Sequence, residues 1–192
     1  MNLIVEQGNT KLKVAVFDYG KIIASVFLDK EDTASVKDIV KQYNPIRGII
    51  SSVADTDESL VFYLKEHIKT LLWLDKNTPM PIRLEYETKE TLGKDRIAAA
   101  VGANYLQPGR NLLVIDAGTA ITYEVIESSG TYKGGNISPG LTTRFRALNQ
   151  FTKRLPLIKE KNDVPLIGTS TESAILAGVV NGIVFEMDGY ID

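Results

Sequence analysis

Two short segments of the chain combine a carboxylate, a glycine and a hydroxyl at the end of an apolar run. The first, Leu3–Thr10, reads LIVEQGNT, and the second, Leu113–Ala120, reads LVIDAGTA. A second apolar run follows each, so both predict a strand, a tight glycine turn and a returning strand. Glycine lets backbone N–H groups approach a ligand closely. Such groups and hydroxyls can hold phosphate oxygens, and a carboxylate can face a metal ion or its water shell.

Either segment alone also has an ordinary structural interpretation. Gly8–Asn9 is a favoured turn pair of a simple hairpin, although Lys13 returns on the next strand, where its ammonium could reach a phosphate. Asp116–Thr119 presents the same choice. Their joint occurrence, each after a strand and at the opening of its own half of the chain, favours phosphate binding. We therefore expect the two turns to hold one phosphate chain from opposite sides.

A third candidate is Gly93–Arg96, which reads GKDR and opens an alanine-rich stretch. Its position slightly favours a structural role for Asp95, as an N-cap or first-turn residue that stabilises a helix by about 1 kcal/mol. The functional alternative places a proton-accepting carboxylate beside Arg96, whose guanidinium can bind an anion through two hydrogen bonds.

Other polar or glycine-rich features are less specific. Gly134–Gly140 is equally consistent with packing and with close approach to a ligand, and Thr169–Glu172 is more typical of a helix cap than of a site. His67 is the only histidine, and we expect it on a solvated surface. The sequence contains no G-x-S-x-G, G-x-x-x-x-G-K-[ST] or G-x-G-x-x-G motif, so a nucleotide would be held in another way.

Composition excludes several classes of protein. The chain has 192 residues, 44% of them hydrophobic and 24% charged, with a net charge of -2 and no cysteine. This near-neutral charge gives no reason to expect nucleic acid or an anionic membrane as a partner. Disulfides and thiolate metal sites are excluded, and we see neither a signal peptide nor an apolar stretch near the ~20 residues that span a bilayer. We expect a cytoplasmic protein.

Hydrophobic periodicity predicts an α/β protein built by internal duplication, because a β-β-β-α order occurs twice. The expected strands are 3–5, 12–17, 22–28, 48–51, 71–74, 112–116, 120–126 and 131–137. The expected helices are 33–43, 57–70, 95–106, 140–150 and 171–187. We expect 75–91 to be irregular or an edge segment. The predicted domains are 1–110 and 111–192.

Taken in order, these motifs resemble those of the type III pantothenate kinases, a family once also described as Bvg accessory factors. The resemblance covers essentially the whole chain. It implies two ribonuclease-H-like lobes of the actin and sugar-kinase superfamily, with ATP between them. It also implies phosphorylation of pantothenate to 4'-phosphopantothenate, the first step of coenzyme A synthesis. The implied cofactors are Mg²⁺ and a monovalent cation, K⁺ or NH4⁺, and the implied assembly is a homodimer.

The same resemblance assigns site residues. Asp95 would be the catalytic base, and Asp116 would lie at the monovalent-cation site. ATP would be held by one run of residues and one threonine: Glu6, Gln7, Gly8, Asn9, Thr10, Lys11, Leu12, Lys13 and Thr119. Pantothenate would be held by a second set: Tyr86, Gly93, Lys94, Asp95, Arg96 and Thr171.

The chain departs from the family pattern in two respects. Glu6 stands where the family has Asp, and the extra methylene moves the carboxylate outward, which could weaken a magnesium site that demands near-ideal octahedral geometry. Members also usually continue past the helix where this chain stops, so we expect an incomplete second lobe. Two alternatives follow: a catalytically impaired accessory protein on the same fold, or a different small-molecule kinase or ATPase.

Overall fold

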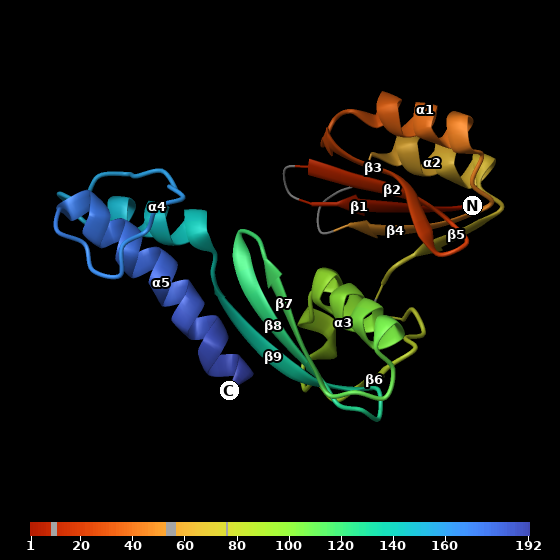
Figure 1. Cartoon of the computed structure of the whole chain (residues 1–192). Helices are drawn as coiled ribbons and strands as arrows, with labels where there is room; N and C mark the ends of the chain where they lie inside the picture. Colours follow the sequence, from red (N-terminus) through yellow and green to blue (C-terminus); the bar gives the residue numbers. More distant parts are fainter. Residues whose placement is uncertain (9–10, 53–56, 76) are drawn as a thin grey trace. The chain divides into compact units, whose positions relative to one another are not determined.

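The computed structural model describes residues 1–8, 11–52, 57–75 and 77–192. Contacts divide the chain into two compact units (Figure 1). Unit 1 comprises Met1–Met80 and Thr88–Asp95, and unit 2 comprises Pro81–Glu87 and Arg96–Asp192. This division assigns nearly all of helix α3 to unit 2, whereas a boundary at residue 110 for the two ribonuclease-H-like lobes stays a prediction.

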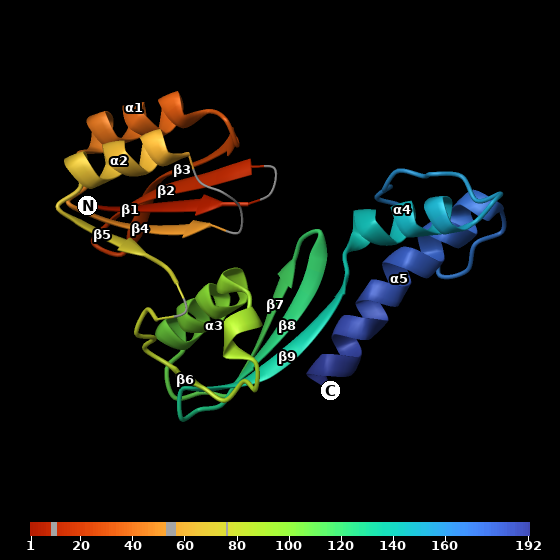
Figure 2. The ribbon, with the colours of Figure 1, turned by 180° about the vertical axis from the view of Figure 1, so that it is seen from behind.

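Unit 1 is a five-stranded sheet with strand order β3-β2-β1-β4-β5. The strands are β1 (Asn2–Gln7), β2 (Lys11–Asp18), β3 (Lys21–Asp29), β4 (Arg47–Ser52) and β5 (Thr70–Trp73). The first three form the predicted antiparallel meander, while β4 and β5 join in parallel. Helices α1 (Thr33–Tyr43) and α2 (Glu58–His67) lie side by side over one face of the sheet (Figures 1 and 2).

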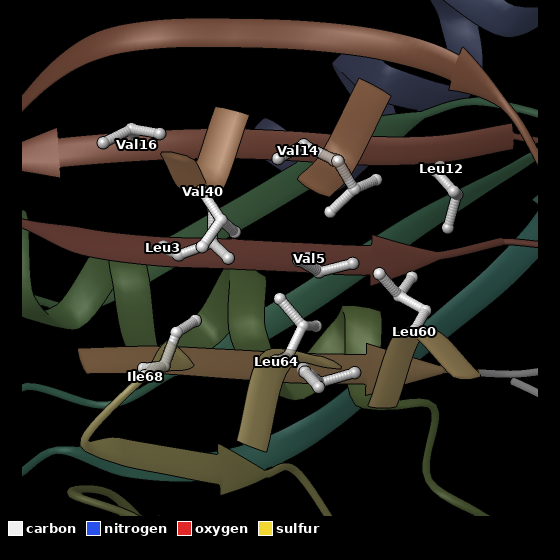
Figure 3. Packing of buried hydrophobic residues seen from close by; sticks show 11 residues of the cluster. Leu3, Val5, Leu12, Val14, Val16, Val40, Leu60, Leu64 and Ile68 are labelled. Atoms are coloured by element: carbon white, nitrogen blue, oxygen red, sulfur yellow. The ribbon is translucent and has the colours of Figure 1, made fainter. Parts of the chain in front are cut away.

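The core of unit 1 follows from strand periodicity. Alternate residues such as Leu3 and Val5 point to the same side of the sheet, where Val40 of α1 and Leu64 of α2 meet them (Figure 3). All four are at most 3% exposed. Burial of such a side chain contributes about 1.5–3 kcal/mol, so this layer fixes the register of β1 against its neighbours.

Local side chains set the helix ends in unit 1. Asp32 caps α1 by accepting a hydrogen bond from the Ser35 amide at 3.1 Å, and Asp57 caps α2 through the Ser59 amide at 2.7 Å. Helix α1 ends where Asn44 adopts a left-handed conformation with φ 45°. Asparagine tolerates this conformation better than most residues, which explains the stop before Pro45.

Unit 2 is a four-stranded sheet with order β6-β9-β8-β7. Its strands are β6 (Arg83–Leu84), β7 (Leu112–Ala117), β8 (Ala120–Ile126) and β9 (Thr131–Pro139). Its helices are α3 (Lys94–Leu106), α4 (Leu141–Phe151) and α5 (Thr171–Ile191). The predicted meander of β7, β8 and β9 is confirmed. The two-residue β6, within a segment expected to be irregular or at an edge, is an edge strand parallel to β9.

Helix α5 corrects one expectation from the sequence. It has 21 residues and, among the described residues, is the one helix long and apolar enough by length and composition to cross a membrane. One such helix is a weak indication, because core helices of soluble proteins pass the same test. It begins with the predicted cap: Ser170 and Ser173 form a reciprocal capping box.

The C-terminal half of α5 lies beside β9 (Figure 2). Polar and aromatic side-chain contacts join it to β8 and β9. Glu186 accepts hydrogen bonds from Arg144 of α4 and from Ser138 of β9. The rings of Tyr190 and Tyr123 lie 4.3 Å apart. These contacts show that α5 packs on the sheet as part of unit 2.

Two glycines permit close backbone contacts along β9. A Cβ atom at Gly135 would lie 1.7 Å from the Tyr123 carbonyl oxygen, and one at Gly140 would lie 2.0 Å from the Gly118 carbonyl oxygen. Both distances are far below van der Waals contact, and the obstructing atoms are backbone, which cannot move aside cheaply. The glycine-rich junction that the sequence left open between packing and ligand approach therefore has a packing role at both positions.

Replacing Gly135 by Ala is expected to lower the free energy of unfolding by more than about 4 kcal/mol, since the methyl group must displace β8 backbone. Gly102→Ala in α3 is the matched control, because a Cβ there meets nothing within 4 Å. The free energy of unfolding of that control is expected to rise by about 0.5–1 kcal/mol. Urea unfolding measures both, and equal stability of the two variants would contradict the packing role.

The buried tyrosine of β8 predicts a loss of stability in alkali. Burial and the neighbouring Glu186 carboxylate raise the pKa of Tyr123 from 10.0 to about 12. The unfolded chain releases this proton near pH 10, and the folded chain retains it until about pH 12, so its contribution is complete below pH 10 and is lost as the pH rises through this interval. Between pH 9.5 and 11.5, wild type is expected to lose about 2 kcal/mol more than Tyr123→Phe in urea unfolding. Identical pH profiles would contradict this assignment.

Candidate functional site

The carboxyl ends of β1 and β4 bring three polar residues together in unit 1. Gln7 and Ser52 are paired across these parallel strands, both are less than 9% exposed, and the Ser52 hydroxyl lies 3.4 Å from Gln7 Oε1. Lys94 reaches the same edge, where its Nζ donates to the Ser52 carbonyl at 3.0 Å. Ligands of α/β sheets commonly bind outside the carboxyl ends of strands. Two residues predicted to bind different substrates, Gln7 and Lys94, thus lie at one edge of unit 1.

The first predicted turn leaves the sheet at this same edge. The last paired residues of β1 and β2 are Gln7 and Leu12, and the Gly8 amide donates to the Lys11 carbonyl at 2.9 Å. Asn9 and Thr10 were also predicted to hold ATP, and they lie outside the described residues. The predicted strand and returning strand are confirmed on either side of them.

The remaining residues assigned to ATP at this turn differ in whether their side chains are accessible to a ligand. Glu6 and Lys13 form an ion pair of 3.2 Å, and Lys11 pairs with Asp29 at 2.5 Å. The Leu12 side chain is 1% exposed and belongs to the core of unit 1. Leu12 can therefore reach a ligand only through its backbone, while the three charged residues remain accessible to solvent.

The second predicted turn, in unit 2, is one residue shorter. Ala117 and Ile121 are the last paired residues of β7 and β8, so three residues separate them rather than four. The Gly118 amide donates to the Ala120 carbonyl at 2.9 Å. Asp116 is exposed at the end of β7, just before the bend. Each glycine is thus followed by a returning antiparallel strand, but the Gly8 amide donates to the third residue after it and the Gly118 amide to the second.

The start of α4 holds the second turn in place. The Thr119 carbonyl accepts hydrogen bonds from the Gly140 amide at 3.0 Å and from the Thr143 hydroxyl at 2.7 Å. Because Gly140 lacks a side chain, the helix start can approach the turn this closely. The contact fixes Thr119, the residue expected to hold ATP, against α4.

The GKDR segment forms the start of α3. Gly93 is half-buried directly before the helix, and Asp95 is exposed in its first turn. A carboxylate at this position interacts favourably with the partial positive charge of the helix N-terminus. The structural role expected for Asp95 is therefore present, and its exposure also leaves the carboxylate accessible to a substrate.

Arg96 lies in a different environment from its neighbour. It is 5% exposed, and its Nε and Nη2 donate to the two carboxylate oxygens of Glu124 at 2.7 and 2.8 Å. This bidentate pair raises the pKa of the Arg96 guanidinium above its usual value. Sequence reasoning missed Glu124, and its only signal was a charged residue inside the apolar pattern of β8.

Tyr86 lies against this ion pair. It is half-buried, its ring centroid is 5.8 Å from the Arg96 guanidinium carbon, and it is 6.1 Å from the ring of Tyr132. Gly134 has φ +123°, and a Cβ atom there would lie 3.7 Å from the Tyr86 ring. Tyr86 and Arg96 are thus neighbours within unit 2, and their predicted role in binding pantothenate stays a prediction.

Thr171 opens α5 and lines a separate, mostly apolar pocket of about 770 Å³ between α4 and α5. Its other walls come mainly from aliphatic side chains, with one guanidinium: Pro139, Arg144, Ala147, Leu148, Leu155, Ala174, Ile175, Gly178 and Val179. Aliphatic walls with a few polar groups are typical of a small-molecule pocket.

The described residues contain no acidic cluster of the kind that forms a metal cage. No group of three or more His, Asp or Glu residues that could hold a metal ion occurs in the described parts of the chain. Magnesium in kinases needs only one or two carboxylates, because phosphates and waters supply its other ligands. Glu6 and Asp116 each stand beside a glycine bend, and their predicted roles near a divalent and a monovalent cation stay predictions.

Comparisons with known proteins agree with this arrangement. A family model described as "Type III pantothenate kinase" matches residues 2–192. A protein of that name from Bacteroides fragilis is 47% identical over 191 residues, which cover 100% of this chain and 79% of the relative. Relatives of the same name from Porphyromonas gingivalis and Cytophaga hutchinsonii are 46% and 41% identical, and the chain covers 79% and 80% of them.

A solved structure supports the fold. A Baf family protein from Campylobacter jejuni, described as a transcriptional activator, superimposes with a TM-score of 0.59 at 22% identity. The match covers 97% of this chain and 78% of that one. The predicted α/β fold class is confirmed, and its assignment to the actin and sugar-kinase superfamily stays a prediction. The match over residues 2–192 and identities above 40% over the full chain show that this chain belongs to the type III pantothenate kinase family.

Proposed function

We propose that the chain phosphorylates pantothenate with ATP to give 4'-phosphopantothenate, the first committed reaction of coenzyme A synthesis. The observation that carries the proposal is family membership along the whole chain, since relatives named for this activity are 41–47% identical to it. The enzyme is a phosphotransferase to an alcohol group. As a member of a soluble enzyme family, it acts in the cytoplasm.

The two glycine bends hold the phosphates of ATP. In the first, residues 6–13 supply backbone amides, and the ammonium groups of Lys11 and Lys13 supply positive charge. In the second, Thr119 adds a contact from a position fixed by α4. Phosphoryl transfer depends mainly on positioning and on neutralisation of charge. Backbone amides and ammonium groups provide both.

Asp95 is the general base. The primary hydroxyl of pantothenate attacks the γ-phosphorus of ATP, a new O–P bond forms, and the bond to the β-phosphate oxygen breaks to release ADP. The hydroxyl proton passes to the Asp95 carboxylate, whose exposure in the first turn of α3 supports this role. Tyr86, Gly93, Lys94 and Arg96 line the pantothenate site.

Glu6 would help to hold a divalent cation, which would neutralise charge on the phosphates, and Asp116 would hold a monovalent cation such as K⁺. Magnesium in such sites is commonly held by one or two carboxylates together with substrate phosphates and water. The functional assembly is a homodimer, in which Thr171 closes the pantothenate site.

An ATP-consumption assay with and without pantothenate, in potassium and then in sodium, tests the proposal. Turnover that depends on pantothenate and is faster in potassium is expected. Turnover without pantothenate would instead indicate another ATPase or kinase. Absence of turnover from a folded protein would indicate the accessory role.

Replacing Asp95 by Asn is expected to lower kcat by about 10²–10⁴, the usual effect of losing a general base. The melting temperature should change little, because loss of one helix-dipole contact costs only about 0.3–1 kcal/mol. Asp38→Asn, which alters an exposed carboxylate on α1, is the matched control and should leave kcat unchanged. Near-full activity of the Asp95 variant would remove it from the role of base.

Replacing Gly8 by Ala is expected to raise the dissociation constant of an ATP analogue about tenfold. The added Cβ would lie 3.3 Å from the Lys11 carbonyl oxygen, which is tighter than nearly all real Cβ contacts, so the bend must shift. Isothermal titration calorimetry measures the affinity, with Gly102→Ala as the control. Unchanged affinity would count against the first bend as a phosphate site.

A further inference from the structure

The carboxylate of Glu124 is the most completely enclosed charged group described in unit 2. Its residue is 0% exposed. It accepts two hydrogen bonds from Arg96, and Oε2 accepts a third from the Tyr132 hydroxyl at 2.5 Å. All three hydrogen bonds come from side chains of unit 2, namely Arg96 and Tyr132. In return, two planar groups, a guanidinium and a phenol, are fixed in orientation by one residue.

The strand opposite is shaped to admit this carboxylate. Gly135 is the register partner of Glu124, and a Cβ atom there would lie 2.9 Å from Glu124 Oε2. The preceding Gly134 adopts φ +123°, a conformation that side chains rarely adopt, and lies against the Tyr86 ring. Gly135 therefore makes room for the carboxylate, while Gly134 is suited to its position by its positive φ.

Stability alone does not explain this arrangement. Removing two charges from water is costly, and replacement of a buried ion pair by apolar side chains is often neutral or stabilising. What such a pair does provide is a defined geometry, because the bidentate contact sets both distance and orientation. The geometry set here belongs to the first turn of α3, since Arg96 lies in that turn directly after Asp95.

We infer that Glu124 is a positioning residue: through Arg96 it fixes the first turn of α3 and hence the direction of the Asp95 carboxylate. Tyr132 supports it by fixing the second carboxylate oxygen. Arg96 then acts chiefly as an anchor for the base, while Tyr86 covers its outer side. The inference rests on the proposed function, in which Asp95 is the general base.

Kinetic constants of Glu124→Gln test this inference. The variant preserves side-chain length and removes the charge that holds the guanidinium, so kcat is expected to fall at least tenfold while the KM for ATP stays within twofold. Glu124→Asp retains the charge on a shorter stem and is expected to recover at least threefold in kcat relative to Glu124→Gln. Ile126→Val is the matched control, because this buried residue lies on the same strand outside the site, and its kcat should stay within twofold of wild type.

Tyr132→Phe provides a milder variant if Glu124→Gln does not fold. It removes one hydroxyl and leaves the ion pair in place, and a two- to fivefold lower kcat is expected. A kcat equal to wild type in Tyr132→Phe, or a loss in Glu124→Gln no larger than that of Ile126→Val, would overturn the inference.

Hydrogen exchange separates this inference from the proposed function. Amides of residues 94–106 are expected to exchange at least tenfold faster in Glu124→Gln than in wild type and to remain near wild type in Ile126→Val. If wild type shows no turnover that depends on pantothenate, the proposed function fails, and exchange alone then decides whether Glu124 fixes α3. Equal exchange in the two variants would overturn the inference.

Discussion

The buried contact between Arg96 and Glu124 imposes the strongest constraint on unit 2. A carboxylate with no exposure must have all its charge satisfied locally, so its surroundings are determined in detail. Strand β9 needs a glycine at position 135, opposite Glu124, and the Tyr132 hydroxyl must reach Glu124 Oε2. The first turn of α3 must lie close enough to the sheet for Arg96 to reach the same carboxylate. The first turn of α3 and strand β8 are thereby held together, although Arg96 and Glu124 are 28 residues apart in the sequence.

In unit 1, strand pairing rather than a buried ion pair brings the polar residues together. There the parallel pairing of β1 and β4 places Gln7 and Ser52 side by side, and Lys94 donates to the backbone at the same edge. No buried carboxylate is described at that edge. Strand β1 thus ends beside buried polar side chains, and binding of phosphate at the bend that follows stays a proposal.

Much of the fold was predictable because hydrophobic periodicity dominates it. Both three-stranded meanders and the five main helices follow apolar spacing and cap residues, with ends within a few residues of those predicted. The two-residue β6 was not predictable as a strand, because it exists only through pairing with β9. Helix α5 continues beyond the predicted residue 187 because Tyr190 packs on Tyr123, a tertiary contact with no local signal.

The candidate site was predictable in its residue types but not in their partners. Arg96 and the glycine-rich segment were identified as motifs, Tyr86 was added by the family resemblance, and the structure brings all three together around Glu124. A charge within β8 could equally have been solvent-exposed in an antiparallel strand, so sequence alone could not show that it was buried. The different lengths of the two bends likewise depend on strand register, which only the paired sheet defines.

A double-mutant cycle on the unfolding free energy tests the central claim that Arg96 and Glu124 act as one unit. Arg96→Met, Glu124→Gln and the double variant would each be unfolded in urea. We expect each single variant to lose about 3–5 kcal/mol, because it leaves a buried group without its partner, and the double variant to lose at least about 1 kcal/mol less than the sum. Additive losses within about 0.5 kcal/mol would contradict the account.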